Sequence, residues 1–212
     1  MPEEADEGDT ERMAPQHVRI RLLGGFDVQV DDVAVPPGVW RLNKTRSLLK
    51  LLALVEGNRL HRDAIVEVLW PELGVVAGTN NLHQALHAAR RALAVAGASA
   101  GVLRLRDGVV ALCPDGGLET DVQDVEDALH KALASDDLDL LLDVAVRCAL
   151  GLLPEDRYED WLRPQHERVA AMRRTAVLAC AAGCVLASRL SEASRQVGTA
   201  AGGWSGSAYP HA

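Results

Sequence analysis

The stretch from Thr79 to Cys113, TNNLHQALHAARRALAVAGASAGVLRLRDGVVALC, decides the fold of this chain. In its first half, apolar residues recur at the three- and four-residue spacing of an amphipathic helix. They are Leu82, Ala85, Leu86, Ala89 and Leu93. In its second half, two short apolar runs flank Arg106-Asp107-Gly108, which is typical of a β-hairpin turn. The stretch therefore predicts a helix that starts at Thr79, a good N-cap residue, followed by a hairpin.

The far side of the predicted helix carries polar side chains and no acid. At 100° per residue, Asn80, Gln84, His87 and Arg91 fall together. Asn and Gln can pair with adenine, Arg can pair with guanine, and His can donate to a base or a phosphate. A solvated face is the alternative, but such a face usually carries Glu and Lys pairs. A helix that fits the major groove, followed by a hairpin that touches the adjacent backbone, predicts a DNA-reading unit.

Upstream of this stretch the sequence predicts a small sheet and two further helices. VRIRLLGGFDVQV (18–30) alternates apolar and polar residues, as strands do, and a third short strand follows at 33–35. A helical pattern begins at Asn43 and stops at Gly57-Asn58, and a second short helix ends at Trp70-Pro71, with Trp70 facing inward. We therefore expect an α+β winged helix over residues 17–115, with an antiparallel sheet, three helices and a C-terminal wing hairpin.

The remainder of the chain predicts an all-α segment and two tails. Apolar periodicity indicates three helices between residues 119 and 190, starting near 122, 138 and 161. Residues 1–16 and 191–212 lack a foldable pattern, so we expect a disordered acidic tail and a disordered C-terminal tail.

Charge is divided unevenly along the chain, although the formal total is −8. Residues 17–113 carry twelve Lys or Arg and eight acids, whereas the segments on either side are acidic, at −5 and −7. Phosphate binding depends on local charge, so the total does not exclude DNA. Three basic residues near the start of the first helix, Arg41, Lys44 and Arg46, are candidates for backbone contacts, and so is Arg106 at the hairpin tip. A solvated turn is the alternative for each.

Several other classes of protein are disfavoured. The four cysteines show no zinc spacing and are expected to be buried thiols. His83 and His87 are spaced as in a zinc-protease helix, but Gln84 replaces the required glutamate. No phosphate-binding loop or catalytic arrangement stands out, so we expect no enzyme, metal or cofactor. We find no apolar run of about 18 residues and no secretory signal, so we expect no membrane partner and a cytoplasmic location.

Six segments occur together in one order over about residues 17–180. They are VRIRLLGGFDVQVD, WRLNKTRSLLKLLAL, RLHRDAIVEVLWPEL, NNLHQALHAARRAL, LRLRDGVVALCPDG and GLLPEDRYEDW. The set resembles the OmpR-type winged helix and, more closely, the Streptomyces antibiotic regulatory proteins, whose winged helix precedes a bacterial transcriptional activation domain. This resemblance implies that the third helix lies in the major groove, with Asn80, Gln84, His87 and Arg91 reading bases and Arg90 on the backbone. Arg106 takes the wing role.

The resemblance also implies a function. The loop after Trp70, with Glu72, Leu73, Gly74 and Val75, resembles a polymerase-facing loop, and residues 119–190 resemble a tetratricopeptide-like activation domain that contacts RNA polymerase and helps dimerisation. We expect a nucleoid-associated transcriptional regulator, an activator that binds promoter repeats, with a possible homodimer. The family's domain continues through more helices, so we expect a truncated, activation-defective form here. The alternative is a protein-interaction module in which the winged helix is only a scaffold.

Overall fold

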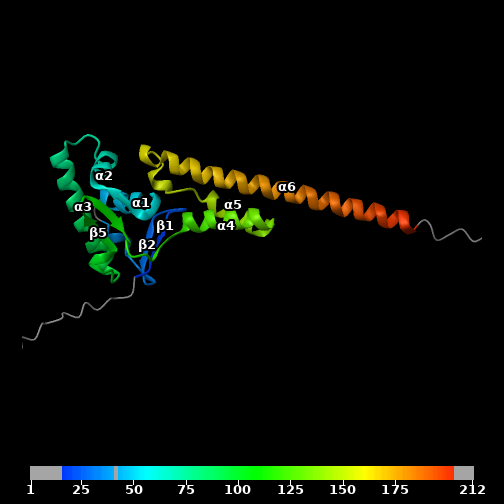
Figure 1. Cartoon of the computed structure of the whole chain (residues 1–212), viewed down its shortest axis with the longest axis horizontal. Helices are drawn as coiled ribbons and strands as arrows, with labels where there is room; N and C mark the ends of the chain where they lie inside the picture. The colour runs from blue at the N-terminus through cyan, green and yellow to red at the C-terminus, as the bar shows by residue number, and fades with distance from the viewer. Residues whose placement is uncertain (1–15, 41–42, 203–212) are drawn as a thin grey trace, which may run out of the picture. The chain divides into compact units, whose positions relative to one another are not determined.

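The computed structural model describes residues 16–40 and 43–202, without side-chain detail beyond residue 191. The chain divides into two compact units, each described by itself below (Figure 1). Unit 1 comprises residues 16–22 and 26–120, and unit 2 comprises Leu23–Gly25 and the chain from Asp121 onward. The acidic tail expected over residues 1–16 lies outside the described residues, apart from Gln16. Residues 203–212 also lie outside them.

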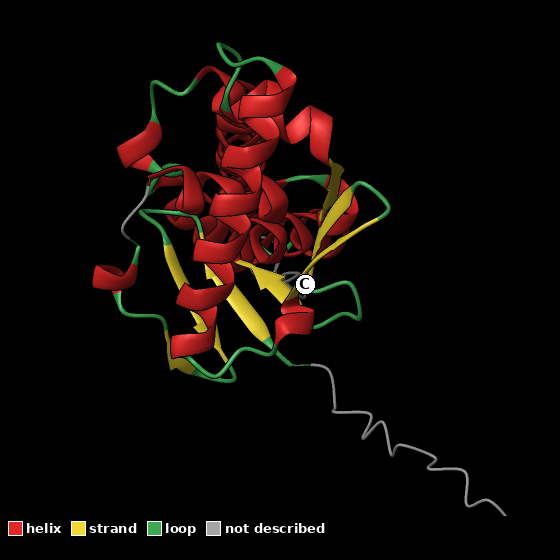
Figure 2. Ribbon diagram, turned by 90° about the vertical axis from the view of Figure 1, so that its left-hand side faces the viewer, coloured by secondary structure: helices red, strands yellow, loops and turns green. Residues whose placement is uncertain are grey.

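A four-stranded sheet forms one part of unit 1, in the order β3-β2-β1-β7. Its strands are β1 (Val18–Arg21), β2 (Asp27–Val30), β3 (Val33–Ala34) and β7 (Leu118–Thr120). Alternate residues of β1 and β2 are fully buried, as the sequence pattern predicts. β7 was not predicted, and it pairs with β1 in parallel, so the sheet is mixed rather than antiparallel. These strands are among the yellow arrows in Figure 2, which draws every described strand in yellow.

Three helices provide most of the core of unit 1. They are α1 (Asn43–Leu54), α2 (Arg62–Leu69) and α3 (Val75–Val95), and α3 packs against both others. Three one-turn 3-10 helices, Pro37–Val39, Glu56–Asn58 and Ala100–Val102, occupy the connections. Leu48, Leu52, Ile65, Leu82 and Leu86 are at most 2% exposed. Burying each such side chain stabilises the fold by about 1.5–3 kcal/mol, before the cost in conformational entropy.

Helix α3 begins at Val75, four residues before the expected start at Thr79. Gly74 is the N-cap, and the Thr79 hydroxyl donates back to the Val75 carbonyl at 2.8 Å within the helix. Gly78 reads as a loop residue in the sequence, but it is buried in this helix. A Cβ at Gly78 would lie 2.3 Å from Cγ1 of Val66, so the glycine allows α2 and α3 to approach closely.

A second sheet contains the predicted hairpin and one additional strand, in the order β4-β6-β5. β5 (Leu103–Arg106) and β6 (Val109–Leu112) are joined by Asp107 and Gly108, both with positive φ, as a two-residue hairpin turn requires. The additional strand β4 (Arg59–His61) pairs with β6 and was not predicted. It joins the hairpin to the segment that leads into α2.

Unit 2 is built from three helices: α4 (Asp121–Ser135), α5 (Leu138–Ala149) and α6 (Arg163–Gly202). α5 packs against both α4 and α6, and short 3-10 turns at Pro154–Asp156 and Asp160–Leu162 lead into α6. α6 continues through residues 191–202, part of the tail that was expected to be disordered. Its Ala-rich composition favours a helix, although Leu186 and Leu190 are 61% and 68% exposed.

Among the described residues, one stretch within α6 and its lead-in is long and apolar enough to cross a membrane, by length and composition alone. It is Asp160–Ser191, with a mean hydropathy of 1.5 and 17% of the window buried. The run expected to be absent was an unbroken apolar one, whereas this stretch qualifies by its mean hydropathy and includes Arg173 and Arg174. The first half of the stretch buries Val169, Met172 and Ala176, and α6 packs against α4 and α5. We therefore describe it as a packing helix of unit 2.

The N-cap of α5 gives a stability prediction. The Asp137 carboxylate accepts a hydrogen bond from the Leu140 backbone amide at 3.0 Å. Replacing Asp137 by Ala should lower the free energy of unfolding of unit 2 by about 1 kcal/mol, since the amide loses its partner. Urea unfolding followed by circular dichroism measures the change. The same substitution at Asp127, exposed within α4, should have no effect or stabilise slightly; equal losses at both positions would contradict the cap.

Candidate nucleic-acid interface

The exposed face of α3 presents the polar side chains that the sequence singles out. Asn80, Gln84, His87 and Arg91 are all exposed, whereas Leu82, Ala85, Leu86, Ala89 and Leu93 are buried on the opposite side. His83 is exposed as well, next to this face, a position that the sequence argument considered only for metal binding. We call Asn80, Gln84, His87 and Arg91 the polar stripe. Its side chains can all meet a partner that lies along the helix.

Arg90 differs from its neighbour Arg91. Its Nε donates to the Leu103 carbonyl at 2.9 Å, and the side chain is partly buried. Arg90 therefore ties α3 to the first strand of the hairpin. The resemblance implies that Arg90 contacts the DNA backbone. In the structure its guanidinium also makes this contact with the hairpin. The helical wheel signals this difference, since Arg90 lies closer than Arg91 to the buried side.

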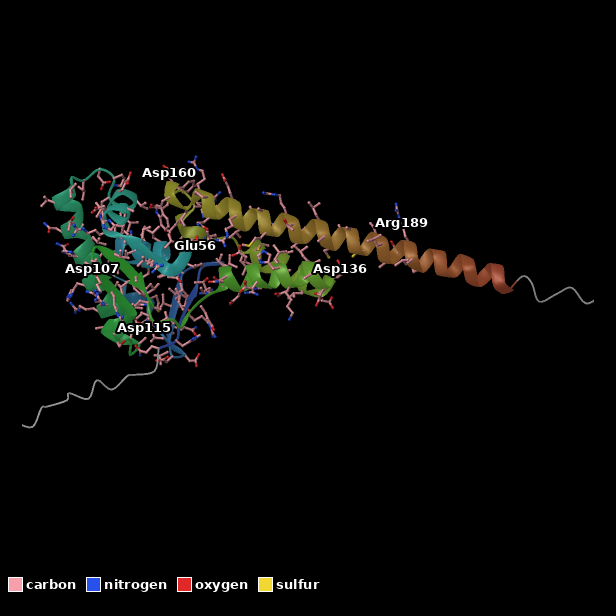
Figure 3. All side chains as sticks on the ribbon, in the orientation of Figure 1. Glu56, Asp107, Asp115, Asp136, Asp160 and Arg189 are labelled. Carbon is pink, nitrogen blue, oxygen red and sulfur yellow. The ribbon has the colours of Figure 1, made fainter. Side chains whose placement is uncertain are left out.

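The hairpin tip presents Arg106 to solvent. The side chains of Arg106 and Asp107 are 89% and 90% exposed, and Nε of Arg106 lies 3.5 Å from the Asp107 carboxylate. Such an exposed pair holds the arginine only weakly, so it remains available to a phosphate. A backbone hydrogen bond fixes the tip to the start of α2, because the Arg62 amide donates to the Gly108 carbonyl at 2.7 Å. Figure 3 labels Asp107 among the side chains of the hairpin.

The start of α1 holds the other predicted backbone contacts. Lys44 and Arg46 are half-buried in its first turn, which contains no acid, and Arg41 lies outside the described residues. Nη2 of Arg46 donates to Oδ1 of Asn43 at 2.7 Å. A helix N-terminus without acids favours an anion, so the local electrostatics suit phosphate.

The segment after Trp70 is shorter than expected. Trp70 is 6% exposed and faces inward, as predicted. Glu72, Leu73 and Gly74 lie in the connection between α2 and α3, but Val75 belongs to the first turn of α3. Val75 and Val76 are both 77% exposed, so this end of the helix shows an apolar pair to solvent.

Two acids of unit 1 are paired with arginines of the sheets. Nη2 of Arg19 lies 3.1 Å from the Glu119 carboxylate, and Arg104 pairs with Asp115. The hydrogen bond from Arg19 and the proximity of His17 keep the pKa of Glu119 below its usual value. These two pairs offset acidic charge that would otherwise repel phosphate.

No cluster of three or more potential metal ligands occurs among the residues that the structure describes. The four cysteines are free thiols. Cys148 is buried and Cys113 and Cys180 are half-buried, but Cys184 is exposed, which corrects the expectation that all four are buried. Burial raises the pKa of Cys113 from 9.0 to about 12.

This shift predicts unequal alkylation. At pH 9 the thiolate fraction of Cys113 should be roughly several hundredfold lower in the folded than in the unfolded protein, because burial raises its pKa. Only the thiolate reacts with an alkylating reagent. Iodoacetamide followed by mass spectrometry should therefore label Cys184 first, and label Cys113 quickly only in urea. A raised folded-state pKa contributes stability below pH 9 that is lost as the pH rises towards 12. Equal labelling of Cys113 and Cys184 in the folded protein would contradict this burial.

Comparison with known proteins gives a likeness of fold. No family model and no curated protein sequence matches the chain. Among solved structures, Mycobacterium tuberculosis EmbR in complex with a low-affinity phosphopeptide matches with a TM-score of 0.61 and 19% identity. The match covers 87% of this chain and 50% of that one, so this chain spans about half the length of that protein. The sheet-containing unit followed by a mostly helical one is thus shared with EmbR at the level of the fold.

Proposed function

We propose that this chain binds double-stranded DNA in a sequence-specific manner and regulates transcription, with α3 as the recognition helix of a winged helix. The observation that carries the proposal is the polar stripe, an exposed helix face that has amide, imidazole and guanidinium groups and no acid. Amide and guanidinium groups are the side chains that pair with base edges in the major groove. The hairpin connected to this helix then serves as the wing.

The arrangement of unit 1 supports this use. α3 has 21 residues and is about 31 Å long, so it can lie along a major groove. Arg106 extends at the hairpin tip, and Arg90 holds the hairpin against the helix. Lys44 and Arg46 belong to the first turn of α1, where the helix N-terminus attracts phosphate. Bases are thus read by α3, whereas α1 and the wing contact the backbone.

Further features of the proposal come from the sequence resemblance to the antibiotic regulatory proteins. We propose an activator that binds promoter repeats as a homodimer in the nucleoid of the cytoplasm and has no enzymatic activity. The connection at Glu72–Gly74, with the exposed Val75, contacts RNA polymerase. Unit 2 is an activation domain of tetratricopeptide-like helices. Its α4–α5 hairpin, packed against α6, has the helix pairing that such repeats use.

A second candidate is a protein-interaction module. It is favoured by the exposed apolar side chains on α6, including Val177, Leu178 and Val185, which suit a protein surface better than DNA. On this view unit 2 binds a partner protein, and unit 1 is only a scaffold. The two candidates differ in one simple result: the regulator is retained on random-sequence DNA at low salt, and the module is not.

The experiment for the proposed function is selection of binding sites from a random duplex library with the full chain. The regulator should enrich a defined motif and bind it at least about a thousandfold more tightly than random sequence. Log affinity should fall linearly with log salt. Retention without enrichment of any motif would contradict sequence-specific reading.

The wing gives a prediction of a different kind. Arg106→Ala should weaken binding to selected and random duplexes by the same factor and lower the salt slope by about 1, because one phosphate contact is lost. Fluorescence anisotropy at several salt concentrations measures both. Arg163→Ala, an exposed arginine of unit 2, is the matched control and should leave the slope unchanged. A change in motif preference in Arg106→Ala would assign this residue to base reading instead.

A further inference from the structure

Unit 2 contains an open groove of about 770 Å³ that the DNA-binding proposal does not use. It lies between the end of α5 with the following loop and the first half of α6. Most of its lining is aliphatic: Leu150, Leu152, Val169, Ala170, Val177 and Leu178. Its volume falls within the range of about 300–1,000 Å³ that small-molecule sites occupy.

Three arginines, Arg157, Arg173 and Arg174, also line the groove. The ion pairs of unit 2 fall elsewhere, on Arg147, Arg163 and Arg168. Arg157 stacks over the Tyr158 ring, with its guanidinium carbon 5.2 Å from the ring centroid. The groove therefore has an apolar lining and guanidinium groups that make no ion pair with another described residue.

One polar atom in the groove wall is buried. His166 lines the groove, and its Nε2 is shielded from solvent and has no hydrogen-bond partner in the part of the chain that the structure describes. Buried polar atoms are nearly always paired, because an unpaired one loses its hydrogen bonds to water and gains none in the protein. In the α6 register, His166, Arg173 and Arg174 share a side with Val169 and Val177, so one helix face offers both polar and apolar contacts.

We propose that this groove binds a small amphiphilic anion, an organic acid with an aliphatic body. The aliphatic body lies on the Leu, Val and Ala side chains, and the carboxylate is bound by Arg173 and Arg174 beside His166. Guanidinium groups pair with carboxylates through charge-assisted hydrogen bonds, which are stronger than those between neutral groups.

The test is binding of dodecanoate to the full chain, below the concentration at which it forms micelles, measured by calorimetry and by displacement of anilinonaphthalene sulfonate. Dodecan-1-ol has the same body without the charge. Dodecanoate should bind with one-to-one stoichiometry, and the alcohol roughly tenfold or more weakly. Arg173→Gln with Arg174→Gln should reduce dodecanoate binding by a similar factor. The matched control, Arg163→Gln with Arg189→Gln, removes the same charge from α6 outside the groove and should change nothing.

Ala170→Phe tests the groove itself, because Ala170 is exposed and lines it. An added ring there should block dodecanoate while circular dichroism stays unchanged. Three results would each overturn the proposal. They are equal affinity for the acid and the alcohol, equal losses in the two double-arginine variants, and binding only of an acidic helical peptide. Since ligand binding is measured without DNA, its failure and the failure of the regulator function are separate results.

Discussion

Gln84→Ala combined with His87→Ala should sharply reduce discrimination between the selected motif and random DNA, by roughly 10- to 100-fold, while leaving the weaker, salt-dependent binding to random DNA intact. An amide that pairs with adenine contributes about 1–3 kcal/mol of discrimination, and loss of the imidazole contact adds to this, so specific affinity should fall roughly 10- to 100-fold. Both side chains are exposed and Ala is a good helix former, so α3 should remain folded. Competition anisotropy with the two duplexes measures the ratio directly.

The control for this pair is on α4. Gln123→Ala with His130→Ala removes the same two side-chain types from exposed helical positions in unit 2. This variant should keep the full ratio of specific to random affinity. Unchanged discrimination in the α3 variant, or an equal loss in the α4 variant, would remove α3 as the reading element.

Gly117→Ala should lower the free energy of unfolding of unit 1 by about 2–4 kcal/mol. Gly117 has φ +85°, and a Cβ there would lie 2.4 Å from the Gln16 carbonyl oxygen, a backbone atom that cannot turn away. The strain of the left-handed conformation adds about 1–2 kcal/mol to this clash. The Val18 amide donates to the Gly117 carbonyl at 2.6 Å at the start of the β1–β7 pair, so the displacement would weaken that pair.

The neighbouring glycine provides the comparison. Gly116 also has a left-handed φ, +94°, but a Cβ there would meet no atom within 4 Å. Gly116→Ala should therefore cost only the conformational strain, about 1–2 kcal/mol. Urea unfolding of the two variants measures the difference. Equal stabilities would show that β7 does not depend on the close approach at Gly117.

The regular elements of unit 1 could be predicted because each has a local pattern. Val18, Ile20, Val28 and Val30 alternate with polar residues and are buried in the sheet. Asp107-Gly108 adopts the turn that its sequence favours. The burial pattern of α3 also agrees with the wheel drawn from the sequence, which is why the polar stripe could be named in advance.

The misses have tertiary causes. β4 and β7 have three residues each, too few for a pattern, and they exist because β6 and β1 offer free edges. Val75 to Gly78 looks like a loop because β-branched residues and glycine disfavour helices, yet close packing of Gly78 on Val66 holds them in α3. The bond from Arg90 to the Leu103 carbonyl is likewise a tertiary contact that the sequence does not show, and the DNA-backbone role that the resemblance implies for Arg90 stays a prediction.

The most direct test of DNA reading by α3 is a titration of the selected duplex into the full chain, with the imidazole resonances of the histidines followed by nuclear magnetic resonance. His83 and His87 lie on the exposed side of α3, and His130 is exposed on α4 in unit 2. We predict that the resonances of His83 and His87 shift in a saturable manner, while that of His130 stays in place. A duplex that binds tightly yet leaves His83 and His87 unmoved would contradict the assignment of α3 as the reading helix.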